Sequence, residues 1–370
     1  MTNELTSECV GPGHPDKVAD QISDAVLDEC LRQDPESRVA CETLIKNNTV
    51  ILAGEITTQA KQLNYYKTVN DALVKIGYDN FCPNVVNLLT EQSREISKAA
   101  DVGAGDQGLM WGYATDETPT LMPTSMYLAR ELVNMLVWNR ENDGCDFLLP
   151  DCKTQATVRD NSVITRLVIS TNHRPEMNDL AELRARLRLM IEEWPCEALH
   201  ELNYFGLTQL DLNPSGLWFF GGPAADTGVC GRKIVVDAYG ADCQVGGGAL
   251  SGKDGTTKVD RSGAYAARYI AKNIVAHKLA RKAKVQLAYV IGQPDPVSFC
   301  VTTGQGSTRD KELQKMVVNK MGLTPKDFAE RFGLNKPIFF ETANRGHFGI
   351  DPCVNSVGNR VYGWEATDLF

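Results

Sequence analysis

The segment from Gly246 to Asp254, Gly-Gly-Gly-Ala-Leu-Ser-Gly-Lys-Asp, has the glycine and lysine spacing of a phosphate-binding loop. Glycines allow backbone N–H groups to turn toward an anion, and Lys253 adds a positive charge. Asp254 stands where such loops usually have Ser or Thr, and a carboxylate suits a metal ion better than a phosphate. The segment therefore predicts a site for a polyphosphate and a metal ion.

A second candidate, Gly13-His14-Pro15-Asp16-Lys17, lies where the first predicted helix begins. Proline in the first turn with an acidic neighbour is an ordinary helix start, which accounts for Pro15 and Asp16. It does not account for the Gly-His pair or for a lysine at a helix end that favours anions. The functional alternative is that His14 faces phosphate while Asp16 binds a metal. The motif alone leaves both interpretations open.

Two other glycine-rich segments contain charged residues. Residues 103–108 fit an ordinary interdomain loop, and they precede a strand instead of linking a strand to a helix as a dinucleotide-binding motif does. Residues 221–228 contain Asp226 and lead to Arg232-Lys233, a charge pair that a solvated strand edge would also explain. With Trp218 nearby, this second segment is compatible with a nucleotide pocket, because it offers an aromatic face and a carboxylate.

Several charged residues are candidates outside these loops. Glu42 and Glu55 lie in apolar segments with strand spacing, where an unpaired charge is costly, so each is a candidate ligand for a cation or an amino group. Asp151 and Lys153 open a predicted hairpin and on their own indicate a surface turn. His347 is expected to be structural rather than catalytic.

Composition limits the class of protein. The chain has 370 residues, 43% hydrophobic and 23% charged, which predicts a globular protein of two or three domains. Its net charge of −9 and the lack of a basic run argue against a nucleic-acid partner. Neither an apolar run of membrane-spanning length nor a secretory leader is found, so no membrane association is expected. Eleven cysteines without a C-x-x-C motif predict reduced thiols in a cytoplasmic protein, without a disulfide framework or zinc site.

Hydrophobic periodicity predicts a similar order of elements in each third of the chain. The first third has predicted strands at 5–10, 38–46, 50–57 and 84–89 and helices at 15–32 and 63–76. The middle third has strands at 109–113, 154–159 and 163–171, helices at 123–139 and 177–193, and an apolar stretch at 204–212. The last third has strands at 233–238, 285–291, 297–302 and 337–341 and helices at 261–282, 309–321 and 325–332.

This order predicts an α+β protein of three pseudo-symmetric β-α-β-β-α-β domains, each with two layers, at residues 1–101, 102–220 and 221–370. A sheet with helices on one face needs its other face covered. The broad, partly apolar sheets therefore also predict pairing with a second subunit.

Taken together, residues 13–17, 103–108, 246–254 and 258–262 closely resemble the S-adenosylmethionine synthetase family, over nearly the whole chain. The resemblance implies three intertwined domains and a homo-oligomer, a dimer or a tetramer, with active sites at the subunit interface. It implies that the methionine sulfur attacks C5′ of ATP and that the expelled triphosphate is hydrolysed to pyrophosphate and phosphate. A thioether has no proton to lose, so the first step needs in-line placement and charge stabilisation, not a general base.

The resemblance also implies a role for each site residue. The catalytic contacts to the triphosphate would come from His14, Lys153, Arg232, Lys233 and Lys253. The ATP pocket would further include Asp106, Asp151, Asp226, Ala249 and Trp218, which would stack on adenine. Methionine would be bound by Glu55, Gln92, Asp226 and Lys258. Two Mg²⁺ ions per site would be held by Asp16 and Asp260, and K⁺ by Glu42. Asp254 is left without a role.

The sequence departs from the family pattern at several positions. Leu250 and Trp218 stand where the family commonly has Phe, and residues 255–257 are one residue longer than usual, which puts the position of Lys258 in doubt. Residues 92–101 are shorter than the family's mobile lid. This difference predicts a reduced or differently gated lid.

The sequence disfavours two alternative functions. A phosphotransferase or ATPase built on residues 247–253 is disfavoured, because no Ser or Thr follows Lys253 and no helix is predicted to start there. A catalytically silent regulatory subunit is disfavoured because the candidate site residues, among them His14, Asp16, Lys153, Lys253 and Asp260, are all present.

Overall fold

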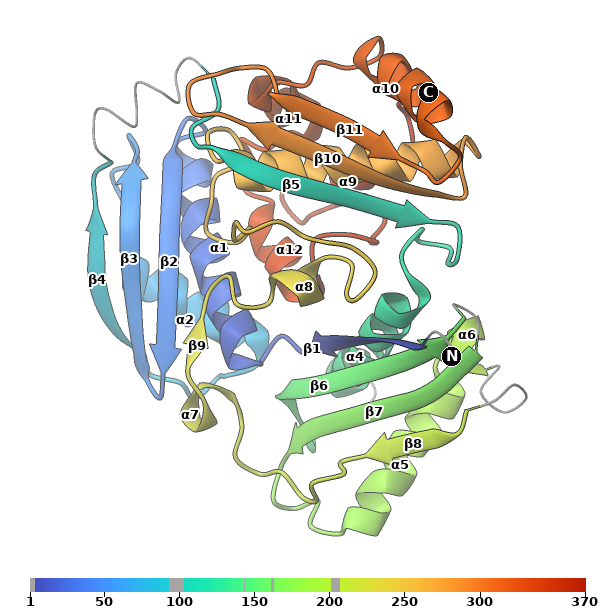
Figure 1. Ribbon diagram of the computed structural model, residues 1–370. Helices are drawn as coiled ribbons and strands as arrows, with labels where there is room; N and C mark the ends of the chain where they lie inside the picture. The colour runs from blue at the N-terminus through green and yellow to red at the C-terminus, as the bar shows by residue number, and fades with distance from the viewer. Residues whose placement is uncertain (1–3, 93–102, 143, 161–162, 201–206) are drawn as a thin grey trace.

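The computed structural model describes residues 4–92, 103–142, 144–160, 163–200 and 207–370. Among the described residues, three larger sheets, beside the two-stranded β12-β13 sheet, lie around a centre that contains the short helices α8 (Ile234–Asp237) and α12 (Phe339–Arg345) (Figure 1). Helices pack against one face of each of these three larger sheets (Figure 1). The architecture is a mixed α+β fold of three units, which confirms the predicted fold class.

The first sheet has the order β4-β3-β2-β9 and the third has the order β11-β10-β5. The strands of the first are β2 (Arg38–Lys46), β3 (Thr49–Thr57), β4 (Asn84–Thr90) and β9 (Gly228–Val229), with helices α1 (Pro15–Gln33) and α2 (Tyr65–Ile76). The strands of the third are β5 (Gly108–Thr115), β10 (Lys282–Tyr289) and β11 (Ser298–Thr302), with helices α9 (Val259–Ala276), α10 (Ser307–Val318) and α11 (Pro325–Phe332).

The second sheet has the order β1-β6-β7-β8. Its strands are β1 (Glu4–Val10), β6 (Leu148–Arg159), β7 (Val163–His173) and β8 (Gln209–Leu212), with helices α4 (Thr124–Asn142), α5 (Leu180–Glu193) and α6 (Glu197–His200). The remaining short elements are α7 (Gly222–Ala225), β12 (Cys353–Val354), β13 (Arg360–Val361) and the 3₁₀ turn Gly363–Glu365.

The three units exchange strands. β1 pairs antiparallel with β6, β5 pairs with β10, and β9 pairs with β2. Consequently the polypeptide crosses between the units several times, and segments far apart in sequence meet at the centre of the molecule. The domain boundaries at 1–101, 102–220 and 221–370 stay a prediction.

The sequence-based assignment of three segments is wrong. Residues 233–238 form the helical turn α8 instead of a strand, and residues 337–341 lead into α12. Both are short apolar runs, which periodicity alone cannot assign to strand or helix. The buried carboxylate of Asp28 accepts hydrogen bonds from the amides of Phe339 and Phe340, and these bonds stabilise the start of α12. The predicted helix 261–282 ends at Ala276, before β10.

The acidic residues of α1 do not form a solvent-exposed face. Asp16, Asp20, Asp24 and Asp28, which follow one another at four-residue spacing, are all buried. Repulsion between like charges at this spacing would weaken an isolated helix, so each carboxylate needs a partner. Each one accepts hydrogen bonds from a segment outside the helix.

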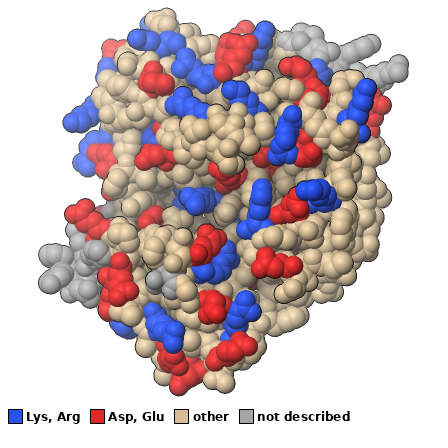
Figure 2. All heavy atoms as spheres, turned by 180° about the vertical axis from the view of Figure 1, so that it is seen from behind, with Lys and Arg blue, Asp and Glu red and all other residues tan. Residues whose placement is uncertain are grey.

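The surface gives further limits. No helix in the described ranges is long and apolar enough to cross a membrane. Seen from behind, the molecule shows acidic and basic side chains interspersed on that face (Figure 2). Most of the predicted lid, residues 93–101, lies outside the described residues, and so do residues 204–206 of the predicted apolar stretch.

Candidate active site

His14 is the N-cap residue of α1, and its side chain accepts a hydrogen bond from the amide of Asp16 at Nδ1, 3.2 Å away. A ring nitrogen that accepts from an amide carries no proton, so in neutral His14 the proton is on Nε2. Burial, with help from the nearby charges of Lys233 and Lys153, lowers the pKa of His14 to about 3. His14 is therefore a neutral hydrogen-bond donor over the whole physiological pH range.

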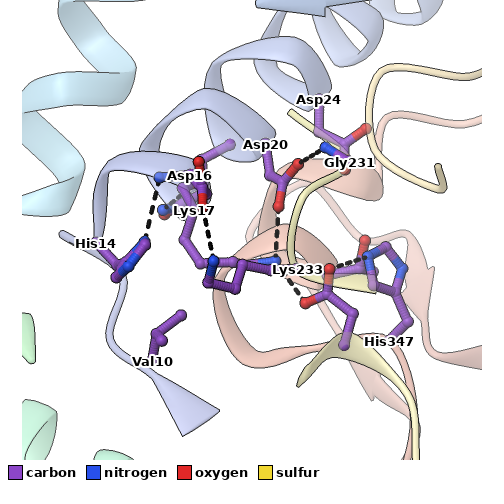
Figure 3. Close-up of polar contacts among 12 residues, drawn as sticks. Val10, His14, Asp16, Lys17, Asp20, Asp24, Gly231, Lys233 and His347 are labelled. Atoms are coloured by element: carbon purple, nitrogen blue, oxygen red, sulfur yellow. Dashed lines mark hydrogen bonds and ion pairs between the residues drawn. The ribbon is translucent and has the colours of Figure 1, made fainter. Parts of the chain in front are cut away.

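Asp16, in the first turn of the same helix, forms ion pairs with Arg232 and Lys233. Its carboxylate lies 2.6 Å from Nζ of Lys233 (Figure 3). It also lies 3.5 Å from Nε of Arg232 and accepts from the amide of Val229 at 3.0 Å. Although burial alone would raise it, the hydrogen bond and charge of Lys233 hold the pKa of Asp16 below its usual value. His14, Asp16, Arg232 and Lys233 thus lie together at the start of α1.

β6 brings Asp151 and Lys153 to the same end of α1. Lys153 pairs with Val10 across the β1–β6 ladder, and it is close enough to lower the pKa of His14. Asp151 is buried and accepts from the amide of Gly222 at 2.7 Å. Burial raises its pKa to about 6, with the nearby charge of Asp226 adding to the effect. Asp226, which is exposed, therefore lies near both Asp151 and His14.

The glycine-rich loop carries the second part of the site. Nζ of Lys253 lies 2.6 Å from the carboxylate of Asp260, near the start of α9. A Cβ at Gly248 would lie 2.2 Å from the carboxylate carbon of Asp260, so a side chain at this position would displace that carboxylate. Ala249 packs toward Gly231, where an added Cβ would lie 2.6 Å from the methyl group. The loop therefore adjoins the segment that carries Arg232.

β2 holds both cation-bearing loops. The amide of Cys230 donates to the carbonyl of Thr43 at 3.0 Å, and the amide of Cys41 donates to the carbonyl of Gly252 at 2.9 Å. Glu42 lies between these two attachment points on the strand, and its carboxylate accepts from the thiol of Cys230. Glu42, predicted to bind K⁺, is thus beside both loops.

The other predicted residues are less closely gathered. Glu55 is exposed on β3, paired with Ala40, which in turn bridges to Lys253. Lys258 is the N-cap residue of α9, although its side chain makes no capping bond. The amide oxygen of Gln92 is buried without a partner among the described residues.

Trp218 and Asp106 contact their own surroundings. The indole of Trp218 donates to the carbonyl of Phe220 at 2.8 Å, and its backbone pairs with His173 of β7. Asp106 is exposed and accepts from the amide of Gln107. The structure thus gathers the predicted triphosphate residues but leaves the adenine and methionine contacts as predictions.

Four buried charged residues near the site were not predicted from the sequence: Asp20, Asp24, Asp237 and Arg261. Asp20 accepts from the amide of Gly231 at 2.8 Å, and Lys17 joins Asp20 to Asp237 at 3.1 and 2.5 Å (Figure 3). The four-residue spacing of the aspartates on α1 was the available signal. His347 is fully buried, with its Nδ1 2.7 Å from the hydroxyl of Tyr265, as expected for a structural histidine.

Asp254, without a role in the sequence analysis, is structural. One of its carboxylate oxygens accepts from the amide of Val39 at 2.9 Å, and the other accepts from the amides of Thr256 and Thr257. It is fully buried and fixes the turn between the glycine-rich loop and α9. Asp254, which the sequence suggested as a metal ligand, instead accepts these backbone hydrogen bonds.

The fold and the cluster define a class of enzyme: an α+β protein with cationic loops at a helix N-terminus, suited to a nucleoside polyphosphate. Family models of S-adenosylmethionine synthetase match the N-terminal domain at residues 2–94, the central domain at 101–218 and the C-terminal domain at 220–357. The chain belongs to the S-adenosylmethionine synthetase family and is a methionine adenosyltransferase, whose substrates are ATP and methionine. This membership confirms the predicted family and enzyme class.

The pKa of His14 predicts how stability depends on pH. Its folded-state pKa of about 3 lies below the ordinary 6.5, so the unfolded chain binds the proton more readily. The free energy of unfolding should fall as pH drops from 6.5 toward 3, by at most about 1.4 kcal/mol per pH unit for this group. Replacing His14 with Asn should flatten part of this slope. Urea unfolding of both proteins between pH 7 and 4.5 measures it, and identical slopes would contradict it.

Proposed function

We propose that this site catalyses attack of the methionine sulfur on C5′ of ATP, with departure of the intact triphosphate. A sulfur lone pair forms the S–C5′ bond while the C5′–O5′ bond breaks, and the electron pair leaves with the triphosphate. The product is the sulfonium S-adenosylmethionine. The triphosphate is then hydrolysed to pyrophosphate and phosphate at the same site.

The neutral His14 carries this proposal. Its Nε2–H is free of the helix, because Nδ1 is taken by the amide of Asp16. A neutral donor beside the helix N-terminus suits an oxygen that gains negative charge as the C5′–O5′ bond breaks. Lys153, Arg232, Lys233 and Lys253 would stabilise the rest of the triphosphate, since charges fixed beforehand need no reorganisation during the reaction.

The carboxylates fit a Mg²⁺ role. In the described part of the chain no three His, Cys, Asp or Glu residues gather into a protein-only metal site. Mg²⁺ commonly takes one or two carboxylates and completes its coordination with phosphate and water. Asp16 and Asp260 would each supply one such carboxylate, for two ions per site. When bound, Mg²⁺ would neutralise triphosphate charge, and Lys233 and Lys253 would then turn from the carboxylates to phosphate oxygens.

The remaining ligand contacts follow the family resemblance. Glu42 would bind K⁺. Glu55, Gln92, Asp226 and Lys258 would bind methionine, and Asp106, Asp151, Ala249 and Trp218 would complete the ATP pocket. The location of the enzyme in the cytoplasm also stays a prediction.

Product analysis tests the reaction. Purified protein with ATP, methionine, Mg²⁺ and K⁺ should release S-adenosylmethionine, pyrophosphate and phosphate in equal amounts. A phosphotransferase would instead release ADP. Detection of ADP without a sulfonium product would refute the proposal. A repeat of the assay without K⁺ checks the role assigned to Glu42.

We also propose a homo-oligomer that pairs through the free face of the first sheet. In register on that face lie Leu44, Ile51 and Val86 in one row and Glu42, Ala53 and Leu88 in the next. Leu88 is 58% exposed, and Leu44 and Val86 are also exposed. Apolar side chains in adjacent rows of a sheet are typical of a subunit interface.

Leu88→Glu tests this surface. Burying a charge in an apolar interface is costly, so the variant should have the mass of a monomer by light scattering and should lose most turnover. Val354→Glu is the matched control, because Val354 is 68% exposed on β12, outside the sheet. A Leu88→Glu protein with unchanged mass would contradict the proposed interface.

A further inference from the structure

We propose that Asp24, together with Arg261, is a positioning residue that holds Lys253 and Asp260 against α1. The inference rests on the proposed triphosphate site. Neither residue faces that site, and both are fully buried. Their role would be to fix the distance between the two halves of the site, the His14 end of α1 and the glycine-rich loop.

The buried face of α1 contacts each cation-bearing segment through a different residue. Lys17, Asp20 and Asp24 follow one another at spacings that place them on one side of the helix. Lys17 binds Asp237 of α8, which follows Lys233, and Asp20 accepts from the amide of Gly231, next to Arg232 (Figure 3). Asp24 accepts from the amide of Gly252, next to Lys253, at 2.8 Å. Helix α1 therefore acts as a template for both loops.

Asp24 also binds the helix that carries Asp260. Arg261 donates to its two oxygens at 2.6 and 2.9 Å, in the two-pronged geometry that fixes direction as well as distance. The same guanidinium donates to the carbonyl of Lys253 at 3.1 Å. One carboxylate and one guanidinium thus join α1, the loop and the start of α9.

Arg261 also makes hydrogen bonds and a cation–π contact with other buried side chains. It donates to the hydroxyls of Tyr265 and Thr342 at 3.0 and 3.1 Å and lies over the ring of Phe339, 4.1 Å from its centroid. A lysine at this position would keep a charge but lose the planar fork. The surrounding contacts leave the Asp24–Arg261 pair little freedom to shift, which is what a positioning role requires.

The expected result of Asp24→Asn is a loss of kcat/KM for ATP on the order of 10²-fold, because a displacement of about 1 Å at a reacting centre costs that much. The amide also faces the Arg261 donors with an NH₂ group and cannot accept both bonds. Binding of Mg²⁺–tripolyphosphate, measured by calorimetry, should weaken by about tenfold, since Lys253 is displaced. This binding readout does not depend on the methionine chemistry.

Glu365→Gln is the matched control. Glu365 is a fully buried carboxylate that binds Arg268 at 2.8 and 3.0 Å, and Arg268 lies on the same helix as Arg261, seven residues later. Glu365 also binds Lys272 and the amide of Gly349, and neither of these residues is predicted to contact a ligand. This control should lose a comparable amount of thermal stability while keeping kcat/KM and tripolyphosphate affinity.

The outcomes separate this inference from the proposed function. If wild-type protein binds tripolyphosphate but makes no S-adenosylmethionine, the reaction proposal fails while the binding comparison still tests positioning. If Asp24→Asn and Glu365→Gln lose equal activity and affinity, or if neither loses any, the positioning role is overturned. Should Asp24→Asn fail to fold, Arg261→Lys against Arg268→Lys makes the same comparison with the charges kept.

Discussion

Replacing Lys253 with methionine is expected to lower kcat by about 10²- to 10³-fold, the loss typical of removing one preorganised charge-stabilising group. The ammonium of Lys253 lies 2.6 Å from Asp260, with a side chain 20% exposed, so it can reach a triphosphate without unfolding the loop. The departing triphosphate gains charge as the C5′–O5′ bond breaks. Loss of a fixed cation should therefore affect the transition state more than ATP binding, lowering kcat more than it raises KM.

Methionine keeps the length and apolar stem of the lysine, so the fold should survive. Lys272→Met is the control for loss of a lysine–carboxylate pair, because Lys272 of α9 lies 2.8 Å from Glu365 of the 3₁₀ turn. Steady-state kinetics of both variants, beside their thermal unfolding curves, distinguish catalysis from stability. Equal kcat values in the two variants would mean that the Lys253–Asp260 pair is only structural.

Local patterns predicted much of this fold from the sequence. Helix α11 and strand β2 have the predicted bounds, and α1 differs by one residue. Such elements are encoded by neighbours in the chain: an alternating row of buried residues in β2, or a proline and capping threonine at the start of α11. The strand exchange was not encoded in this way, because the pairing of β1 with β6 depends on residues about 150 positions apart.

The candidate site shows the same division. His14, Asp16, Arg232, Lys233, Lys253 and Asp260 were predicted from motifs, and the structure gathers them into two adjoining clusters. Asp20, Asp24 and Arg261, which join these clusters, were missed because charged residues on a helix usually face water. The two aspartates can be buried because the loops at 231 and 252 fold against α1 and donate hydrogen bonds to them.

Replacing His14 with asparagine is expected to lower kcat by about 10²- to 10³-fold while changing stability little at neutral pH. Asparagine is also a favoured N-cap residue, so its side-chain oxygen can accept the amide of Asp16 as Nδ1 of His14 does. The lost feature is the Nε2–H donor. The variant therefore separates the helix cap from the hydrogen bond to the leaving oxygen.

The pH profile decides which proton state of His14 acts. Because its pKa is lowered to about 3, His14 should be a neutral donor throughout pH 6–9, and kcat of the wild type and of His14→Asn should vary with pH in the same way. An acidic limb near pH 6.5 that disappears in the variant would instead identify His14 as a titrating acid. His277→Asn, at the distant C-cap of α9, controls for the substitution itself. If His14→Asn keeps wild-type kcat, the helix N-terminus and the lysines alone support departure of the triphosphate.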